Sequence, residues 1–238
     1  MKIALLGYGK MGKRIAELAT SQGHEVVVMI NSNQTSIDYR DAEVAIDFST
    51  PESAPSLIKS ALVAGLPVVS GTTGWLEKYS EIANFCNANN GAFLYASNFS
   101  LGVNIFFRLN EYLAQMMGQF KQYDISITET HHLEKKDAPS GTALSLAKDV
   151  LSTTKYLNWT LDSGQETDDT LLIRSIREGS LPGTHEVAYN SPIDTISIKH
   201  QAHNRDGFVQ GAIMAAEWIL GKKGVFSMQD VLGNQNNL

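Results

Sequence analysis

The sequence predicts an α/β fold in which a doubly wound parallel sheet carries an inserted α+β domain. Over the first hundred residues, short apolar runs alternate with helical patterns, as in a parallel sheet covered on both faces. After residue 100 the apolar runs alternate with polar positions and are separated by Gly and Pro turns. That change indicates a second sheet that is antiparallel or mixed.

The first domain is expected to contain five strands joined by helical sequence and right-handed crossovers. The predicted strands are 2–6, 25–30, 43–47, 67–70 and 92–95. A helix at 11–21 follows the first strand. A helix at 51–64 should begin at Pro51, because proline is favoured at the first helical position.

The inserted domain is expected to begin with a helix at 101–117 and to contain a second helix after Pro139. Its predicted strands are 123–131, 170–176, 184–189 and 195–201, and the polar segment 158–169 is predicted to be a loop. An apolar helix at 211–220 should pack back on the first domain. We therefore place the first domain at 1–100 with 208–238, and the inserted domain at 101–207.

Composition excludes several classes of protein. The chain has 238 residues, 43% of them apolar and 18% charged, as in an ordinary soluble globular protein. Its net charge of -6 argues against general binding to nucleic acid or to an anionic membrane. Cys86 is the single cysteine, which excludes an intrachain disulfide. The N-terminal apolar run stops at Gly7, too early for a secretory signal, so we expect a cytoplasmic protein with no membrane span.

A glycine motif lies between the first strand and the first helix. Gly7, Gly9 and Gly12 have the GxGxxG spacing, and Lys10 adds a positive charge. The first glycine allows a tight turn, the second allows a pyrophosphate to approach, and the third allows helix and strand to pack closely. In this strand–helix setting the motif predicts a Rossmann-type dinucleotide site, with a simple turn as the alternative.

Three further segments should lie at the carboxyl ends of the strands, where such sheets bind ligands. Asn31 ends the second strand and is neutral, so NADPH and NADH both stay open as cofactors. The loop with Gly71, Thr72 and Thr73 follows the fourth strand and offers hydroxyls near a nicotinamide. The loop 95–100 follows the fifth strand. Ordinary turn chemistry is the alternative for both loops.

The segment ETHHLEKKDAPSGTAL, residues 129–144, places two histidines ahead of a helix start. Adjacent strand residues point to opposite faces, so His131 and His132 are not expected to share a metal ion; a solvated turn is another alternative. Ser140, Gly141 and Thr142 would present N–H groups at the positive end of a helix. With Lys135 nearby they predict a carboxylate or phosphate site beside a histidine that can transfer protons.

These residues resemble the signature of the dihydrodipicolinate reductase (4-hydroxy-tetrahydrodipicolinate reductase) family. The signature reads Glu-x-His-His-x-x-Lys-x-Asp-x-Pro-Ser-Gly-Thr, from Glu129 to Thr142. Supporting matches are DFSTP at 47–51, GTTG at 71–74, NFSLGVN at 98–104, SIREG at 175–179 and GTHEV at 183–187. The loop at Gly7 is one residue shorter than is usual in the family.

The resemblance implies NAD(P)H-dependent reduction of a small cyclic dicarboxylate in diaminopimelate and lysine biosynthesis. It implies proton transfer by His131 and Lys135, with His132, Ser140, Gly141 and Thr142 as substrate contacts. The implied cofactor contacts are Gly7, Tyr8, Gly9, Lys10, Met11, Gly12, Gly71, Thr72, Thr73, Ala96, Ser97, Asn98 and Phe99. Asn31 is a further predicted cofactor contact because of its place after the second strand, where it departs from the family pattern. The inserted domain would bind substrate and assemble a homotetramer. Another two-domain dehydrogenase and a non-catalytic nucleotide sensor are the alternatives.

Overall fold

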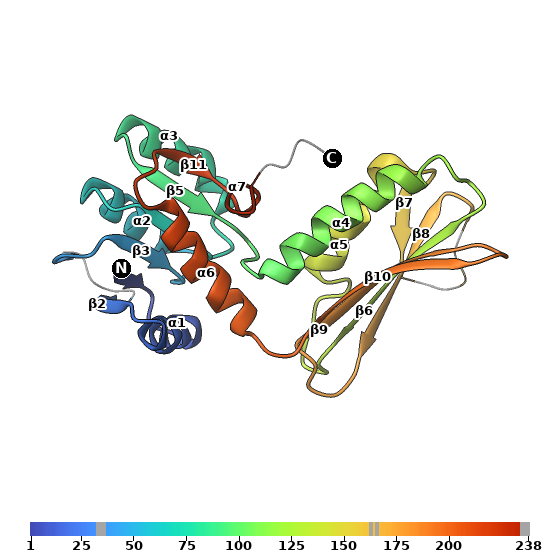
Figure 1. Ribbon diagram of the computed structural model, residues 1–238, viewed down its shortest axis with the longest axis horizontal. Coiled ribbons are helices and arrows are strands. Elements are labelled where there is room, and N and C mark those ends of the chain that lie inside the picture. Colours follow the sequence, from blue (N-terminus) through green and yellow to red (C-terminus); the bar gives the residue numbers. More distant parts are fainter. Residues whose placement is uncertain (32–36, 162–163, 165–166, 234–238) are drawn as a thin grey trace. The chain divides into compact units, whose positions relative to one another are not determined.

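The computed structural model describes residues 1–31, 37–161, 164 and 167–233. The chain forms two compact units (Figure 1). Unit 1 comprises Met1–Leu101 and Asp206–Leu238, and unit 2 comprises Gly102–Arg205. The boundaries drawn from the sequence, after 100 and before 208, lie within two residues of these.

Unit 1 contains a six-stranded sheet whose paired strands are all parallel. The strands are β1 (Lys2–Leu6), β2 (Glu25–Ile30), β3 (Val44–Asp47), β4 (Val68–Ser70), β5 (Ala92–Tyr95) and β11 (Gly224–Phe226). Their spatial order is β11-β5-β4-β3-β1-β2. β2 and β3 lie on opposite sides of β1, so the order in which successive strands are added to the sheet reverses at β1. Such a switch point leaves a crevice at the carboxyl ends of the strands, where ligands bind.

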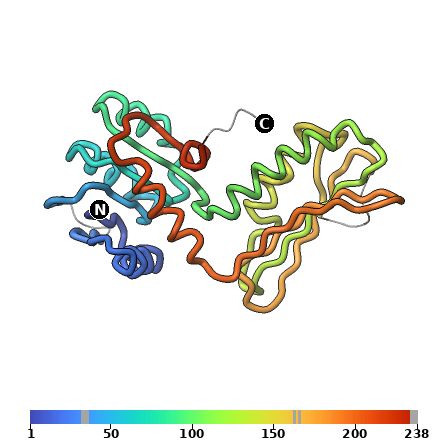
Figure 2. Tube along the Cα trace, in the orientation of Figure 1, coloured from blue at the N-terminus to red at the C-terminus, as the bar shows by residue number. Residues whose placement is uncertain are grey.

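Helices cover both faces of this sheet, which confirms the doubly wound prediction (Figures 1 and 2). α1 (Lys10–Ser21) and α6 (Asp206–Ile219) pack on one face. α2 (Ala54–Val63) and α3 (Tyr79–Ala88) pack on the other. The short η1 (Leu76–Lys78) and α7 (Met228–Val231) complete the unit. Both faces of the central strands β1, β3, β4 and β5 are buried, so these strands read in the sequence as largely apolar runs.

Some predicted element bounds were wrong. α2 begins at Ala54, not Pro51, because Thr50 and Ser53 first form a turn in which the N–H of Ala54 donates to the carbonyl of Thr50 at 2.9 Å. α6 begins at Asp206, five residues before the predicted start, since Asp206, Gly207 and Gln210 interrupt the apolar pattern of its first turns. β7 (Asn158–Thr160), inside the predicted loop, and β11 were missed because three-residue strands carry little periodicity.

Unit 2 contains a mixed five-stranded sheet in the order β10-β9-β6-β8-β7. Its longer strands are β6 (Asp124–His131), β8 (Thr170–Arg177), β9 (Gly183–Asn190) and β10 (Thr195–Ala202). β6 pairs in parallel with β8 and antiparallel with β9. α4 (Leu101–Met117) and α5 (Gly141–Thr153) share a core with one face of the sheet. This arrangement confirms a second, inserted sheet domain.

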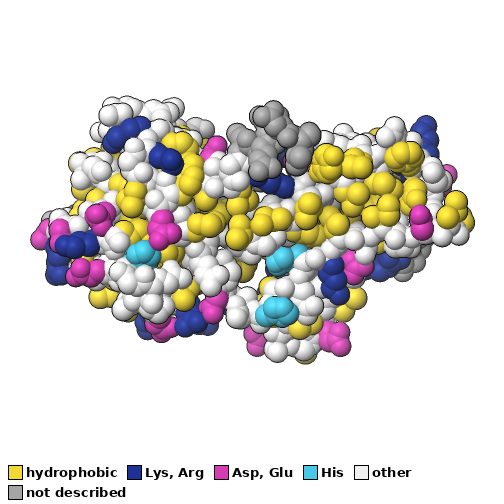
Figure 3. Space-filling model, in the orientation of Figure 1, with side chains coloured by type: hydrophobic (Ala, Val, Ile, Leu, Met, Phe, Trp, Pro, Cys, Tyr) yellow, Lys and Arg dark blue, Asp and Glu magenta, His cyan; other side chains and the backbone are white. Residues whose placement is uncertain are grey.

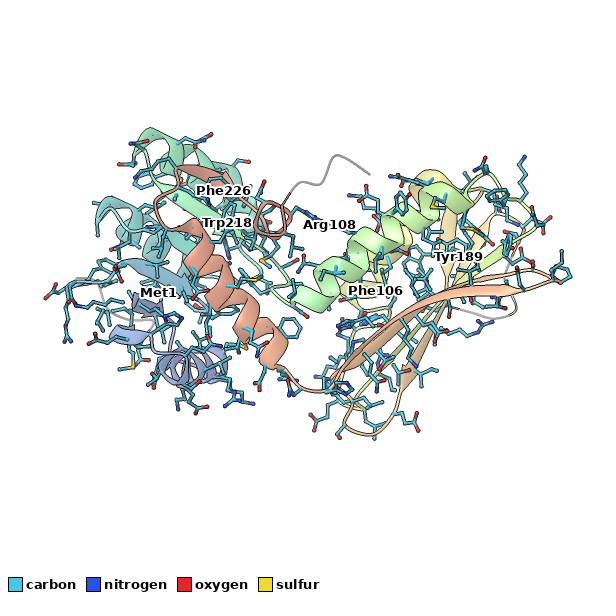
Figure 4. All side chains as sticks on the ribbon, in the orientation of Figure 1. Met1, Phe106, Arg108, Tyr189, Trp218 and Phe226 are labelled. Carbon is cyan, nitrogen blue, oxygen red and sulfur yellow. The ribbon has the colours of Figure 1, made fainter. Side chains whose placement is uncertain are left out.

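The core of unit 2 lies between these helices and the sheet (Figure 4). Phe106 of α4 and Tyr189 of β9 are both buried in it. Alternate residues of β6 face this core, so Ile125 and Ile127 are followed in phase by Glu129 and His131. The apolar part of the core therefore gives way to a polar cluster at the end of β6.

α4 also has apolar side chains on its exposed face, and hydrophobic atoms follow the helix in Figure 3. The exposed residues, spaced three or four apart, are Leu101, Ile105, Leu109, Tyr112 and Met116. A helix that is apolar on two faces is typical of one that packs against more than a single sheet. Within the described residues, no helix is both long enough and apolar enough to cross a membrane.

Candidate functional site

The glycine loop of unit 1 has the geometry of a phosphate cradle. Gly7 has φ +98°, and a Cβ there would lie 2.4 Å from the carbonyl oxygen of Phe48. A Cβ on Gly12 would lie 2.1 Å from the carbonyl oxygen of Gly7. A Cβ on Gly9 would meet no atom within 4 Å, and its φ of -80° is open to any residue. Packing thus requires glycine at positions 7 and 12. At position 9 packing does not require glycine, but the missing side chain keeps space open beside the N-terminus of α1.

The ends of β3 and β4 are joined by the buried carboxylate of Asp47. Its Oδ1 accepts the Ser49 hydroxyl at 2.5 Å, and its Oδ2 accepts the Ser70 hydroxyl at 2.6 Å. Burial raises the pKa of Asp47, although these hydrogen bonds favour the charged form. The hydroxyl of Thr72 accepts the N–H of Ser49 at 2.9 Å, so Asp47 and Thr72 together fix the loop after β4.

The other predicted cofactor residues lie at the same edge of the sheet, after β1, β2, β4 and β5. Phe99 is buried with its ring centroid 5.9 Å from that of Phe48, and the Ala96 N–H donates to the carbonyl of Ser70 at 3.2 Å. The side chain of Asn98 accepts the N–H of Ser100 at 2.9 Å. The exposed predicted residues are Gly9, Lys10, Asn31, Thr73 and Ser97, and the half-buried ones are Tyr8, Met11, Gly71 and Asn98. Ser32, beside Asn31, lies outside the described residues.

In unit 2, Glu129 and His131 lie on the same face of β6. Glu129 is fully buried, and its Oε2 lies 3.3 Å from Nδ1 of His131. The residue opposite Glu129 on β9 is His185, whose Nε2 lies 3.7 Å from the same oxygen. The rings of His131 and His185 meet edge to face, with centroids 5.0 Å apart.

The carboxylate of Glu129 is surrounded by donors. The Ser140 N–H donates to both oxygens at 3.1 Å, the Ser175 hydroxyl to Oε1 at 2.8 Å, and Nη2 of Arg177 to Oε1 at 3.1 Å. Burial acts to raise the pKa of Glu129, but His185 and these donors outweigh it and hold that pKa well below its usual range. Glu129 is therefore a buried, charged residue whose oxygens are satisfied.

His131, unlike the charged Glu129, is held in its uncharged form. Burial lowers its pKa to about 4, against the attraction of Glu129 and with smaller contributions from His185, Lys135 and Arg177. The ring is consequently neutral near pH 7 in the ligand-free protein. A bound anion would favour its protonated form, which is the change that a proton-transfer residue needs.

The start of α5 is organised by Ser140. Its side chain caps the helix by accepting the Ala143 N–H at 3.2 Å, and its hydroxyl lies 3.1 Å from Nε2 of His185. Gly141 follows, and a Cβ there would meet no atom within 4 Å. As at Gly9, neither packing nor backbone conformation requires this glycine. Gly141 and the half-buried Thr142 leave accessible space at the positive end of a helix.

Lys135 lies on the loop between β6 and α5. Its Nζ donates to both carboxylate oxygens of Asp137 at 2.8 Å, and this hydrogen bonding lowers the pKa of Asp137. An arriving carboxylate would therefore compete with Asp137 for the ammonium. His132 is half-buried just beyond β6, and its N–H donates to the carbonyl of Leu181 at 3.0 Å.

Metal-ligating atoms of Glu129, His131 and His185 lie within 4.8 Å of one another. The guanidinium of Arg177 already contacts this carboxylate. A cation beside it would be repelled, and Glu129 would lose donors that it needs while buried. The cluster is better suited to holding protein groups in place than to binding a metal ion.

Comparison with known proteins assigns the chain to a protein family. Its residues 1–99 match the family model "Dihydrodipicolinate reductase, N-terminus", and residues 102–232 match "Dihydrodipicolinate reductase, C-terminus". The chain belongs to the dihydrodipicolinate reductase family. It is thus an NAD(P)H-dependent oxidoreductase with a Rossmann-type domain.

Individual members of the dihydrodipicolinate reductase family match over nearly the whole chain. A 4-hydroxy-tetrahydrodipicolinate reductase from Christiangramia forsetii is 47% identical over 237 residues, which cover 98% of each chain. One from Staphylococcus aureus is 37% identical and covers 98% of this chain and 100% of its own. The dipicolinate-bound dihydrodipicolinate reductase from Paenisporosarcina sp. TG-14 has the same fold, with TM-score 0.76, 20% identity and coverage of 97% and 98%.

The sequence predicted no role for Glu129, which appeared only as the first residue of the signature, nor for its three partners Arg177, Ser175 and His185. The three partners lie in segments that resemble those of the dihydrodipicolinate reductases, SIREG and GTHEV. One signal was available for His185, because it alternates in phase with the buried Val187 and Tyr189. Glu129 joins these residues to the signature segment through strand pairing, which the sequence does not show.

Proposed function

We propose that this protein reduces 4-hydroxy-tetrahydrodipicolinate to tetrahydrodipicolinate with NADPH or NADH, in diaminopimelate and lysine biosynthesis. One observation carries the proposal beyond family membership. The buried carboxylate of Glu129 contacts both His131 and the N-terminus of α5. A proton-transfer group and an anion-binding helix start are thereby held side by side, as reduction of a cyclic dicarboxylate requires.

The substrate carboxylate is proposed to bind at the start of α5. The N–H groups of Gly141 and Thr142 and the Thr142 hydroxyl would donate to it, with Ser140 shaping the turn. Lys135 would leave Asp137 and add a charge-assisted hydrogen bond, which is stronger than a neutral one. His132 would contact the ring from the loop that follows β6.

The reaction removes the 4-hydroxyl as water, adds a hydride at C4 of the ring, and adds a proton to the resulting anion. We assign the proton to His131 or Lys135. His131 is uncharged in the free protein and would acquire a proton when the dianionic substrate lowers the local potential. Either group would then protonate the anion and recover its proton from solvent.

The reduced nicotinamide supplies the hydride when it is bound. Gly7, Gly9 and Gly12 with the N-terminus of α1 would hold its pyrophosphate, because the open space at Gly9 fits a phosphate against backbone N–H groups. The loops with Gly71 to Thr73 and Ala96 to Phe99 would orient the nicotinamide. Asn31 is neutral at the end of β2, so we expect both cofactors to be used.

We also propose that the protein is a cytoplasmic homotetramer assembled through the open face of the unit 2 sheet. That face lies opposite the core shared with α4 and α5, and it carries the exposed residues Arg174, Ile176, Ser197 and Lys199. Light scattering tests this: a mass near four chains is expected, and a monomer would contradict it.

A coupled assay tests the activity. The substrate is generated in situ by its upstream synthase, and oxidation of NADH and of NADPH is followed in separate reactions. Substrate-dependent oxidation of at least one cofactor is expected. No oxidation of either would refute the proposed function, and the ratio of the two rates measures cofactor preference.

A further inference from the structure

We propose that Glu129 and Arg177 are positioning residues, which hold the proton-transfer histidine and the carboxylate-binding loop in one geometry. This inference rests on the proposed function. Neither side chain is required to touch substrate, and both act through His131, Lys135 and Ser140.

Glu129 connects the two halves of the site. From β6 its Oε2 lies 3.3 Å from Nδ1 of His131, while both oxygens accept the N–H of Ser140 at 3.1 Å. Eleven residues separate Glu129 from Ser140 along the chain. A single carboxylate therefore sets the distance between the imidazole and the first turn of α5.

Arg177 connects the same carboxylate to the loop that carries Lys135. Its Nη2 donates to Oε1 of Glu129 at 3.1 Å and to the carbonyl of Asp137 at 2.6 Å, and its Nε donates to the carbonyl of Lys135 at 3.3 Å. The planar guanidinium thus holds the carboxylate of Glu129 and the carbonyls of Asp137 and Lys135 in a fixed geometry. A lysine at this position keeps the charge but cannot reproduce the fork.

Stability alone does not account for this pair. Buried ion pairs commonly contribute less than apolar residues of similar volume, because both charges lose their hydration. Glu129 follows Ile125 and Ile127 on the core face of β6, where a further apolar residue would continue the pattern. What the pair supplies instead is geometry, and misplacement of a reacting group by about 1 Å can cost about 100-fold in rate.

The test compares Arg177→Lys and Glu129→Gln with wild type and with Glu134→Gln, which alters an exposed carboxylate in the same loop. Three quantities are measured: the affinity for pyridine-2,6-dicarboxylate, the affinity for NADH, and kcat. Circular dichroism and thermal unfolding establish which variants are folded. Arg177→Lys and Glu129→Gln should weaken dicarboxylate binding and lower kcat, each by about 10- to 100-fold. NADH affinity should stay within about twofold, since the cofactor residues lie in unit 1.

A purely structural role would lower the melting temperature and leave these constants unchanged in the folded protein. Folded variants with wild-type dicarboxylate affinity and kcat would therefore overturn the proposal. If Glu129→Gln does not fold, Arg177→Lys decides, because it keeps the buried charge. If wild type binds the dicarboxylate but does not turn over substrate, the proposed function fails, and the dicarboxylate affinities alone decide on positioning.

Discussion

Nδ1 of His131 lies 3.3 Å from Oε2 of Glu129, yet the pKa of His131 is low, not high. Burial dominates, and the positive charges of Lys135 and Arg177 offset part of the attraction of the carboxylate. The imidazole therefore lies against a charged carboxylate but is itself uncharged near pH 7 in the ligand-free protein. The consequences of this arrangement can be measured in both activity and stability.

Replacing His131 by Ala should lower kcat by about 10²- to 10⁴-fold, the usual contribution of general acid catalysis. The KM for the dicarboxylate should change less, because the anion site at α5 remains. Steady-state kinetics of cofactor oxidation measure both constants. His24→Gln in unit 1 is the matched control, and an unchanged kcat in His131→Ala would remove His131 from this role.

His131 should also make the fold acid-sensitive. Its folded pKa of about 4 lies below the unfolded value, so between these two values the unfolded chain binds more protons. Stability is then full above the unfolded pKa near 6.5 and falls as pH drops toward 4, by about 2 kcal/mol between pH 7 and 5. Denaturant titrations at both pH values should show a smaller loss in His131→Gln than in wild type. Equal losses would contradict the assigned pKa.

Replacing Lys135 by Met should raise the dicarboxylate KM and lower kcat together, since the ammonium is proposed both to bind the carboxylate and to donate a proton. Lys136→Met changes the exposed neighbour and should leave both constants within about twofold of wild type. Kinetics at saturating cofactor measure the effect. Wild-type values in Lys135→Met would contradict the anion-site model.

Two glycines of the cradle should respond differently to alanine. Gly12→Ala forces a Cβ against the carbonyl of Gly7 and should destabilise unit 1 by about 1–3 kcal/mol. Gly9→Ala meets no atom within 4 Å, so it should fold as wild type but weaken NADH or NADPH binding by about tenfold, or about 1.4 kcal/mol. Thermal unfolding and cofactor titration separate the two. Full affinity in Gly9→Ala would argue against a pyrophosphate at this loop.

Gly141→Ala makes the same test for the substrate. Its Cβ would point into open space at the start of α5, so alanine fits there without strain. Because alanine also restricts the unfolded chain, the free energy of unfolding should rise by about 0.5 kcal/mol. The dicarboxylate KM should nevertheless rise by about tenfold, since the methyl group occupies space intended for a carboxylate. A stabilised variant with unchanged KM would place the substrate elsewhere.

The sequence predicted those parts of the site that depend on local structure. The cradle at Gly7 and the helix start at Ser140 follow from short motifs between a strand and a helix, and both lie where expected. The cluster around Glu129 brings β6, β8 and β9 together through the sheet register. Such pairing is non-local, so Arg177 and His185 could not be joined to Glu129 from spacing alone. The pairing of Lys135 with Asp137 also appears only in three dimensions.

Transfer of labelled hydride tests the central claim most directly. Wild-type protein is supplied with the substrate and with NADH or NADPH that carries deuterium at the reactive C4 position. The account predicts tetrahydrodipicolinate with one deuterium at ring C4, detectable by NMR and mass spectrometry. A product without deuterium, or with deuterium at another carbon, would contradict hydride reduction of the cyclic dicarboxylate at this site.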